Sequence, residues 1–245
     1  MFLIQCFFFI VSFLCPPPEI IWISPCKTAK MHFKPVFGAE KLVLDDKKYV
    51  TVHADTVSIS TFRFYISQIQ CVFDDGSTYD EPNSVHLLDA EKEESLSFDL
   101  KNVPDKPIRF VTYNIGVDSL ANVSGALTGA LDPIFGMYWA WNTGYINAKI
   151  EGKSSSCKTT KNVFEFHIGG YLSPFCALRR VKLPCVFPLT PKGGTVGVGE
   201  FMVEVDVNQW FTHIKLVETN SVLLPSKMAM MVADDYAQMF RMVDE

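Results

Sequence analysis

The feature that most constrains the fold is an alternation of apolar and polar residues, which recurs along the chain from about residue 40 onward. A period of two places successive side chains on opposite faces of a β-strand. The clearest run, Thr56–Phe73, ends at Asp74–Ser77, whose Asp-Gly pair is typical of a hairpin turn. Similar runs predict strands at Ser84–Leu88, Leu96–Leu100, Ile108–Val117, Tyr145–Glu151, Val163–Ile168, Arg179–Leu183 and Gly199–Val207. We therefore predict an all-β fold, an antiparallel β-sandwich with long loops.

Four segments depart from this alternation. Asp118–Asp132 is rich in small residues and predicts a long ordered loop or a short helix. Ser226–Met242 has near-helical spacing after a proline and predicts a short C-terminal helix with Ser226 as its N-cap. The acidic segment Asp89–Glu94 lacks the ligand spacing of a calcium loop and is interpreted as a solvated loop. Gly193–Gly199 opens no helix, so we expect a β-turn there and not a phosphate site.

The N-terminal segment indicates export. Phe2–Leu14 is almost entirely apolar and is stopped by Pro16–Pro18. Its length matches the apolar core of a signal peptide, whereas a membrane-spanning helix needs about 20 residues. A second apolar patch, Ile20–Ile23, leaves membrane anchoring open. We accordingly divide the chain into a signal-like or anchor segment, 1–27, and one body domain, 28–245. We expect a periplasmic or cell-surface protein that meets a membrane only through an uncleaved leader.

Charge and motif content exclude several classes of protein. A net charge of −5 argues against a nucleic-acid-binding surface. The body holds four cysteines, Cys71, Cys157, Cys176 and Cys185, in a chain expected to reach an oxidising compartment. A bridge between Cys176 and Cys185 is conceivable, and the pairing stays open. Because the sequence contains no C-x-x-C pair and no established nucleophile or cofactor motif, we expect neither a structural zinc site nor an enzyme.

The most unusual segment is Leu131–Tyr145, which concentrates two Trp, two Tyr and a Met. In an extended strand Trp139 and Trp141 would lie on the same face. Core packing accounts for such a cluster, but its polarisable side chains would also suit the border of a soft metal site.

Together with its neighbours, this segment carries a resemblance to a known family. The motifs that carry it occur in order at Phe62–Ser67, Val85–Asp89, Gly116–Ser119, Gly129–Pro133, Gly136–Ile146, Lys149–Gly152 and Phe164–Gly170. Over residues 31 to 212 the chain resembles the MbnP family of exported copper-binding proteins, which includes methanobactin-operon partner proteins and copper-repressible surface proteins. The stretch from Met137 to Tyr145 is its most specific part.

The resemblance implies a β-sandwich that binds one copper ion through histidines and a tryptophan oxidised to kynurenine by a partner, a di-haem peroxidase of the MauG type. An indole nitrogen has no lone pair for a metal, whereas the opened ring offers an amine and carbonyl oxygens. Carried over by motif, His167 is the first ligand candidate, His32 the second and His86 a weak third. Either Trp139 or Trp141 is the modified residue.

In one loop the chain departs from the family pattern. Many members place a histidine after asparagine where this sequence has Leu120–Ser124, so one possible ligand is missing. Retention of copper binding in this branch is therefore open. The alternative function is a surface recognition or adhesion domain without a metal, in which both tryptophans are buried and no histidine reaches them.

Overall fold

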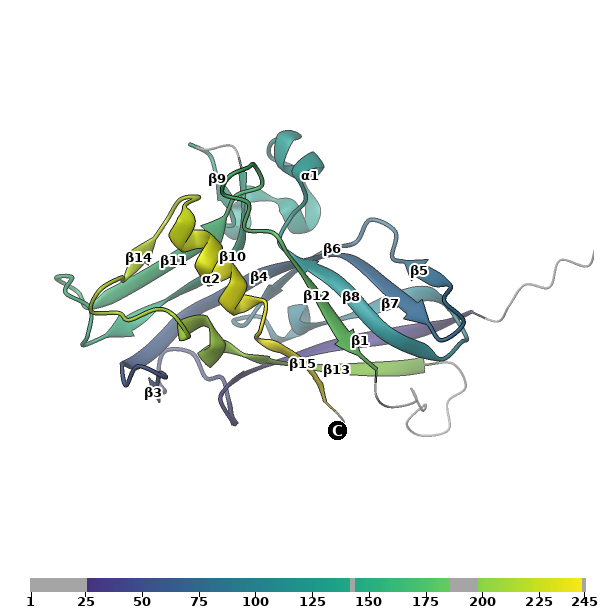
Figure 1. The fold of residues 1–245 in the computed structure, drawn as a ribbon, viewed down its shortest axis with the longest axis horizontal. Coiled ribbons are helices and arrows are strands. Elements are labelled where there is room, and N and C mark those ends of the chain that lie inside the picture. Colours follow the sequence, from purple (N-terminus) through teal and green to yellow (C-terminus); the bar gives the residue numbers. More distant parts are fainter. Residues whose placement is uncertain (1–25, 142–143, 186–197, 244–245) are drawn as a thin grey trace, which may run out of the picture.

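The computed structural model describes residues 26–141, 144–185 and 198–243. Almost all of the predicted leader and most of the predicted glycine-rich turn lie outside these residues. The described chain forms two sheets (Figure 1). The larger sheet has the order β12-β8-β4-β10-β11-β14, with β3, β5 and β6 also paired to β4 and β9 paired to β10. The smaller has the order β15-β13-β1-β2, with β7 paired to β1.

The ten strands of the larger sheet are β3 (Tyr49–Val50), β4 (Thr56–Phe73), β5 (Thr78–Asp80), β6 (Val85–Asp89), β8 (Ile108–Ile115), β9 (Tyr138–Trp139), β10 (Gly144–Ser154), β11 (Val163–Gly169), β12 (Arg179–Pro184) and β14 (Ser221–Val222). The smaller sheet consists of β1 (Cys26–Phe37), β2 (Glu40–Lys41), β7 (Ser97–Pro104), β13 (Val198–Asp206) and β15 (Phe240–Val243). The helices are α1 (Ser119–Val123) and α2 (Lys227–Tyr236), with 3-10 turns η1 (Glu93–Leu96), η2 (Gly129–Leu131), η3 (Pro133–Phe135) and η5 (Val207–Phe211).

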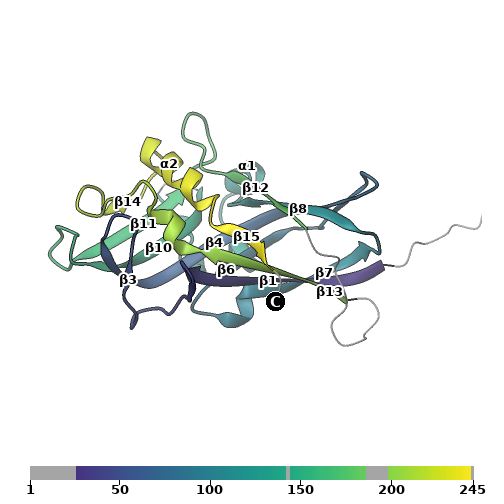
Figure 2. The same cartoon turned by 60° about the horizontal axis from the view of Figure 1, so that its bottom comes forward.

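These two sheets confirm the predicted all-β sandwich, with two differences in detail. The β1–β13 and β11–β14 pairs are parallel, although the prediction was antiparallel throughout. Figure 2 shows β1 and β13 running side by side. The predicted C-terminal helix does begin after Ser226, whose side chain accepts a hydrogen bond from Ala229 N, but it ends at Tyr236. The chain then forms β15, which satisfies the backbone groups of β13 that would otherwise be an open edge.

A single hydrophobic core lies between the sheets. Met31 and Phe33 of β1 enter it from one side, and Phe164, Phe166 and Ile168 of β11 enter it from the other. The alternation at Val163–Ile168 puts these three apolar residues of β11 on one face of the predicted strand, and this is the face that turns to the core. Each sheet therefore has an inner face on this core and an outer face turned away from it.

In β4 the alternation changes phase. Val57 and Ile59 face the core near its start, and Phe62 and Phe64 do so further on, because the pairing with β10 shifts by one residue between them. A bulge of this kind moves every following side chain to the opposite face. The shift turns Arg63 away from the shared core.

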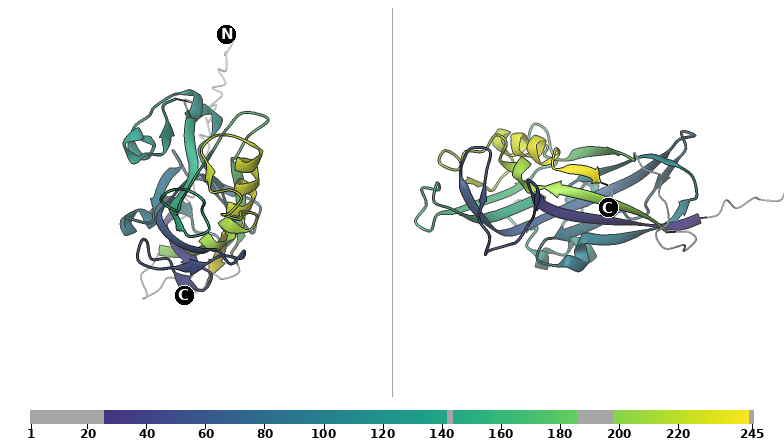
Figure 3. Two further views of the ribbon diagram at one scale, coloured as in Figure 1. Left: turned by 90° about the vertical axis from the view of Figure 1, so that its left-hand side faces the viewer. Right: turned by 90° about the horizontal axis from the view of Figure 1, so that it is seen from below.

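An insert between β8 and β10, described over residues 118–141, covers part of the outer face of the larger sheet through α1, η2, η3 and β9. It begins at α1, the short helix allowed by the sequence, capped by Asp118. Beneath it lies a second, smaller core of Tyr65, Val117, Leu131, Met137, Trp139, Tyr145 and Ile146. In Figures 1 and 3 the α1–β9 segment and strand β1 lie on opposite sides of the molecule. The insert and the smaller sheet therefore cover opposite faces of the larger sheet.

The structure bears on three further expectations from the sequence. The acidic segment is not wholly a solvated loop, because Asp89 is buried at the end of β6, where Arg63 pairs with it. All four body cysteines are free, so the conceivable Cys176–Cys185 bridge is not formed. None of the helices in the described part of the chain is long and apolar enough to cross a membrane.

Candidate functional site

The tryptophan pair predicted from sequence lies in the insert, at the outer face of the larger sheet. Trp139 pairs with Gly144 across β9 and β10 and is 6% exposed, whereas Trp141 is 65% exposed. The two rings are in contact, with centroids 5.8 Å apart and planes inclined by 44°. One indole is thus packed against the sheet while its neighbour faces solvent. The pair therefore extends from a buried position to the surface of the protein.

Trp139 lies on the outer face of β11. A Cβ atom built on Gly169 would come 2.8 Å from Cζ3 of Trp139, so glycine is what lets the indole lie this close to the strand. His167 precedes Gly169 by two residues and points to the same outer face, because Phe166 and Ile168 face the core. Two residues on one face of a strand are about 7 Å apart along it. The first ligand candidate therefore lies on the same face of β11 as Gly169, against which the buried tryptophan packs.

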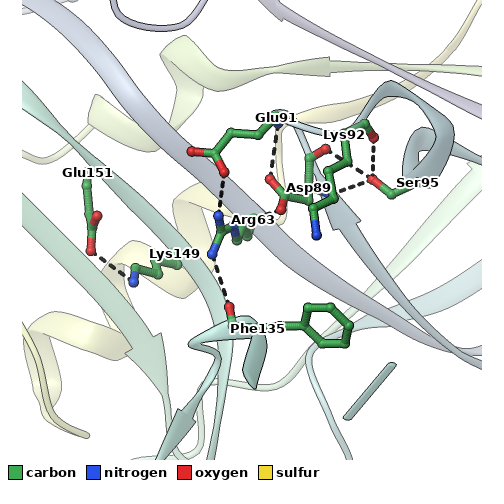
Figure 4. A network of polar contacts seen from close by, with 8 residues as sticks. All are labelled: Arg63, Asp89, Glu91, Lys92, Ser95, Phe135, Lys149 and Glu151. Atoms are coloured by element: carbon green, nitrogen blue, oxygen red, sulfur yellow. Dashed lines mark hydrogen bonds and ion pairs between the residues drawn. The ribbon is translucent and has the colours of Figure 1, made fainter. Parts of the chain in front are cut away.

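His167 is held in place by a carboxylate. Its Nε2 atom is 2.7 Å from Oε1 of Glu151, and the same oxygen is 3.0 Å from Nζ of Lys149. The hydrogen bond from His167, helped by Lys149, lowers the pKa of Glu151 to about 2 against the opposing effect of burial. Figure 4 shows the Glu151–Lys149 pair on β10. The imidazole is thus anchored through one nitrogen.

Next to this group, Arg63 ties the insert to the sheet. Its Nε atom is 3.0 Å from Oδ2 of the buried Asp89, its Nη2 atom pairs with Glu91, and its Nη1 atom donates a hydrogen bond of 3.0 Å to the carbonyl of Phe135 (Figure 4). Register pairs His167 with Lys149, Lys149 with Arg63, and Arg63 with Asp89 across four strands. The outer face beside the tryptophans therefore carries one continuous row of charged and polar groups.

His32, the second ligand candidate, lies in the other sheet. It is half-buried on the outer face of β1, in register with Ser97 of β7 and Met202 of β13, and it borders a groove of about 280 Å³. His167 and His32 each point away from the core that their sheets share. The structure therefore does not bring these two imidazoles together.

His86, the weak third candidate, lies on β6 apart from both. Its ring stacks on Phe98, with centroids 3.6 Å apart and planes inclined by 7°. Its Nε2 atom is 2.9 Å from each carboxylate oxygen of Glu81. Within the residues that the structure describes, no group of three or more His, Cys, Asp or Glu side chains is arranged to hold a metal ion.

Comparison with known proteins gives the family. The family model described as MbnP matches residues 27–230, which is most of the chain. The chain belongs to the MbnP family. Among solved structures, MbnP from Methylosinus trichosporium is similar, with a TM-score of 0.58 and 15% sequence identity over 83% of each chain. At this identity the likeness shows a shared fold. A search of curated proteins found no match.

In this MbnP-family chain, His167 and the tryptophans could be identified as candidates from the sequence. The side chains that surround them could not. Glu151 and Lys149 belonged to a predicted strand and to one family motif, and Arg63 belonged to another, but none of the three was given a role at the site. The motifs do not reveal this role, because the contacts follow from the register of β4, β10 and β11. A charged residue of each sign on β10, two positions apart, was the one available hint.

Proposed function

We propose that this protein is an exported, non-enzymatic copper-binding protein in which an oxidised tryptophan completes the set of copper donors. The observation that carries the proposal is that Trp139 packs against Gly169 on the outer face of β11, two residues along the strand from His167 on the same face. Imidazole nitrogen is a favourable copper ligand. Histidine ligands of metals commonly donate their second ring N–H to a carboxylate, and Glu151 supplies that carboxylate for His167.

The residues fit one copper ion only when the tryptophan has been modified. Glu151 occupies Nε2 of His167, which leaves Nδ1 as the donor. An intact indole adds nothing to this single imidazole, whereas kynurenine adds an aniline-type amine and carbonyl oxygens. His32 lies on the other outer face and is not part of the proposed site. We therefore expect copper binding to depend on the oxidation.

The modification needs an oxidant, for which we propose a di-haem peroxidase of the MauG type that uses hydrogen peroxide. Two peroxides, reduced to water, each supply an oxygen atom as the C2–C3 bond of the indole is broken. Hydrolysis then releases C2 as formic acid and leaves kynurenine, so the residue gains one oxygen and loses one carbon. We assign the change to Trp139, beside His167, and contact with the partner to the exposed Trp141.

The test compares the protein from its native host with the same chain produced without the peroxidase. Peptide mass mapping is expected to show one added oxygen and one lost carbon on the Trp139 peptide from the host. Copper titration is then expected to give saturable one-to-one binding for the oxidised protein and much weaker binding for the unoxidised one. Equal affinities, or an unmodified Trp139 in a protein that binds copper, would contradict the proposal. N-terminal sequencing of the exported form tests the leader.

The second candidate function is a metal-free surface recognition domain. One observation favours it: His32 and His167 lie on opposite outer faces. The burial of both tryptophans that this function was expected to show is found for Trp139 but not for Trp141, which is 65% exposed. Beside the tryptophans is an apolar cavity of about 200 Å³, lined mainly by Trp139, Tyr145, Tyr171, Phe175 and Pro225, where a partner side chain could bind. This function predicts an unmodified tryptophan pair in the native host and no saturable copper binding.

A further inference from the structure

Lys149 is the cation beside the imidazole of His167, and it has no role in the copper proposal. The register of β10 and β11 places it directly opposite His167, with Glu151 two residues further along its own strand. Its Nζ atom is 3.0 Å from Oε1 of Glu151, and the same oxygen is 2.7 Å from Nε2 of His167. The lysine side chain is only 13% exposed, so its ammonium group depends on this carboxylate for a charged partner. One carboxylate oxygen thus serves the lysine and the histidine together.

The neighbours of Glu151 show why its carboxylate needs this cation. The direct register partner of Glu151 is the exposed Glu165 of β11, and like charges that face each other across two strands repel. His167 lies diagonally opposite, at a separation that long side chains can span. On the far side of Lys149, the guanidinium of Arg63 is already engaged by two acidic residues and a backbone carbonyl (Figure 4). Lys149 is therefore the cation that holds Glu151 toward the histidine.

The carboxylate in turn determines which nitrogen of His167 carries the proton. A neutral imidazole has one N–H donor and one nitrogen with a lone pair. An ionised carboxylate can only accept hydrogen bonds, so the nitrogen that faces it has to be the donor. An ammonium group at 3.0 Å favours the ionised form of the carboxylate. With Glu151 held in this way, Nε2 of His167 is the donor and Nδ1 keeps its lone pair.

We propose that Lys149 is a positioning residue that fixes the tautomer of His167, with the proton on Nε2 and the lone pair on Nδ1. The inference rests on the proposed function for its purpose, because Nδ1 is the atom assigned there to copper. Without the ammonium group, the carboxylate of Glu151, whose side chain is 26% exposed, is free to turn toward water. Either nitrogen of the imidazole can then carry the proton, and fewer molecules present a lone pair at Nδ1.

The experiment observes the ring nitrogens of His167 by heteronuclear NMR. It uses the unoxidised, copper-free protein at about pH 8, above the ordinary pKa of imidazole. In the wild type we expect one tautomer, with a protonated nitrogen at Nε2 and an unprotonated one at Nδ1. In Lys149→Met we expect the two nitrogen signals to move toward each other, because both tautomers become populated. Lys149→Arg keeps the cation and is expected to retain the wild-type signals.

A second lysine of the same strand separates positioning from a general effect of charge or stability. Lys153→Met removes an exposed cation of β10 and is expected to leave the signals of His167 unchanged. Lys149→Gln, which stays polar but is uncharged, takes the place of Lys149→Met if that variant does not fold. The proposal is overturned if the wild type carries the proton on Nδ1, if the uncharged variant keeps the wild-type tautomer, or if Lys153→Met changes the tautomer equally. No readout involves copper or an oxidised tryptophan, so failure here is distinguishable from failure of the copper proposal.

Discussion

The two outer faces of the sandwich carry the two leading ligand candidates in very different surroundings. On the larger sheet, His167 is bonded to Glu151, and the insert places Trp139 against Gly169, two residues away on the same face. On the smaller sheet, His32 borders an open groove whose lining includes Met202 and no aromatic ring system comparable to the tryptophan pair. The two histidines look alike in the sequence, since each alternates with core residues on a strand.

This difference teaches that alternation determines which side of a strand a residue occupies, but not what covers that side. At His167 the cover comes from the insert, which reaches the face only because Gly169 leaves space for an indole. At His32 the structure describes no comparable insert. The residues that could form a site are therefore gathered around His167 on one face and are not gathered around His32 on the other. Four predictions test this contrast.

The largest effect is expected from Arg63→Met, which unties the insert from the sheet. The change leaves the buried Asp89 carboxylate without its cation and removes the bond to Phe135, so we expect a loss of about 3 kcal/mol in the free energy of unfolding. Urea denaturation measures it. Lys106→Met, which breaks an exposed pair with Asp75, is the control and should have a much smaller effect. Equal losses in the two variants would mean that Arg63 does not anchor the insert.

Gly169→Ala is expected to displace Trp139. The added Cβ would meet the carbonyl of Tyr145 at 2.6 Å and the indole at 2.8 Å, so we expect a loss of about 1–3 kcal/mol together with a shift of the Trp139 indole resonance. Gly152→Ala creates a similar clash, with Ser58 and Phe164, away from the tryptophans. It is expected to destabilise the protein without moving that resonance. An unshifted indole in Gly169→Ala would show that the ring does not lie against β11.

Glu151→Gln tests the bond to His167 through its dependence on pH. The folded-state pKa of Glu151 is about 2, below its ordinary value of 4.5, so its stabilising contribution is present above pH 4.5 and lost as the pH falls toward 2. Because the group is partly solvated, we expect only about 1 kcal/mol. The stability difference between wild type and variant should therefore shrink on acidification. Glu165→Gln, at the exposed register partner, should show no such trend, and a pH-independent difference for Glu151→Gln would contradict the bond.

The smallest effect is expected at Trp141. Because its side chain is 65% exposed, Trp141→Phe should change the free energy of unfolding by no more than about 0.5 kcal/mol. Trp139→Phe, at a buried position of the small core, should cost clearly more. Thermal denaturation of both variants measures the difference. Similar losses would mean that the two indoles share one environment.

Particular residues show how far the sequence could predict the molecule. Phe164, Phe166 and Ile168 alternate with polar residues in the sequence and face the core, which places His167 on the outer face. The phase change in β4 was not predictable, because it depends on pairing with β10 and turns Arg63 outward. For the same reason, nothing in the local sequence joins Glu151 to His167.

The sequence also did not predict which of the two sheets each strand would join. His32 became a ligand candidate by family resemblance alone, and its opposite placement follows from the parallel pairing of β1 with β13 in the smaller sheet. Long-range pairing of this kind is decided by the whole chain. The side of each strand was therefore predictable, and the neighbours of each site were not.

Copper titration of the tryptophan-oxidised protein, comparing His167→Ala with His32→Ala, tests the central claim most directly. We predict that His167→Ala weakens copper binding at least about tenfold, as for the loss of one ligand worth 1.4 kcal/mol or more, and that His32→Ala binds as the wild type does. NMR spectra of both variants confirm that they are folded. Unchanged affinity in His167→Ala, or an equal loss in His32→Ala, would contradict the account.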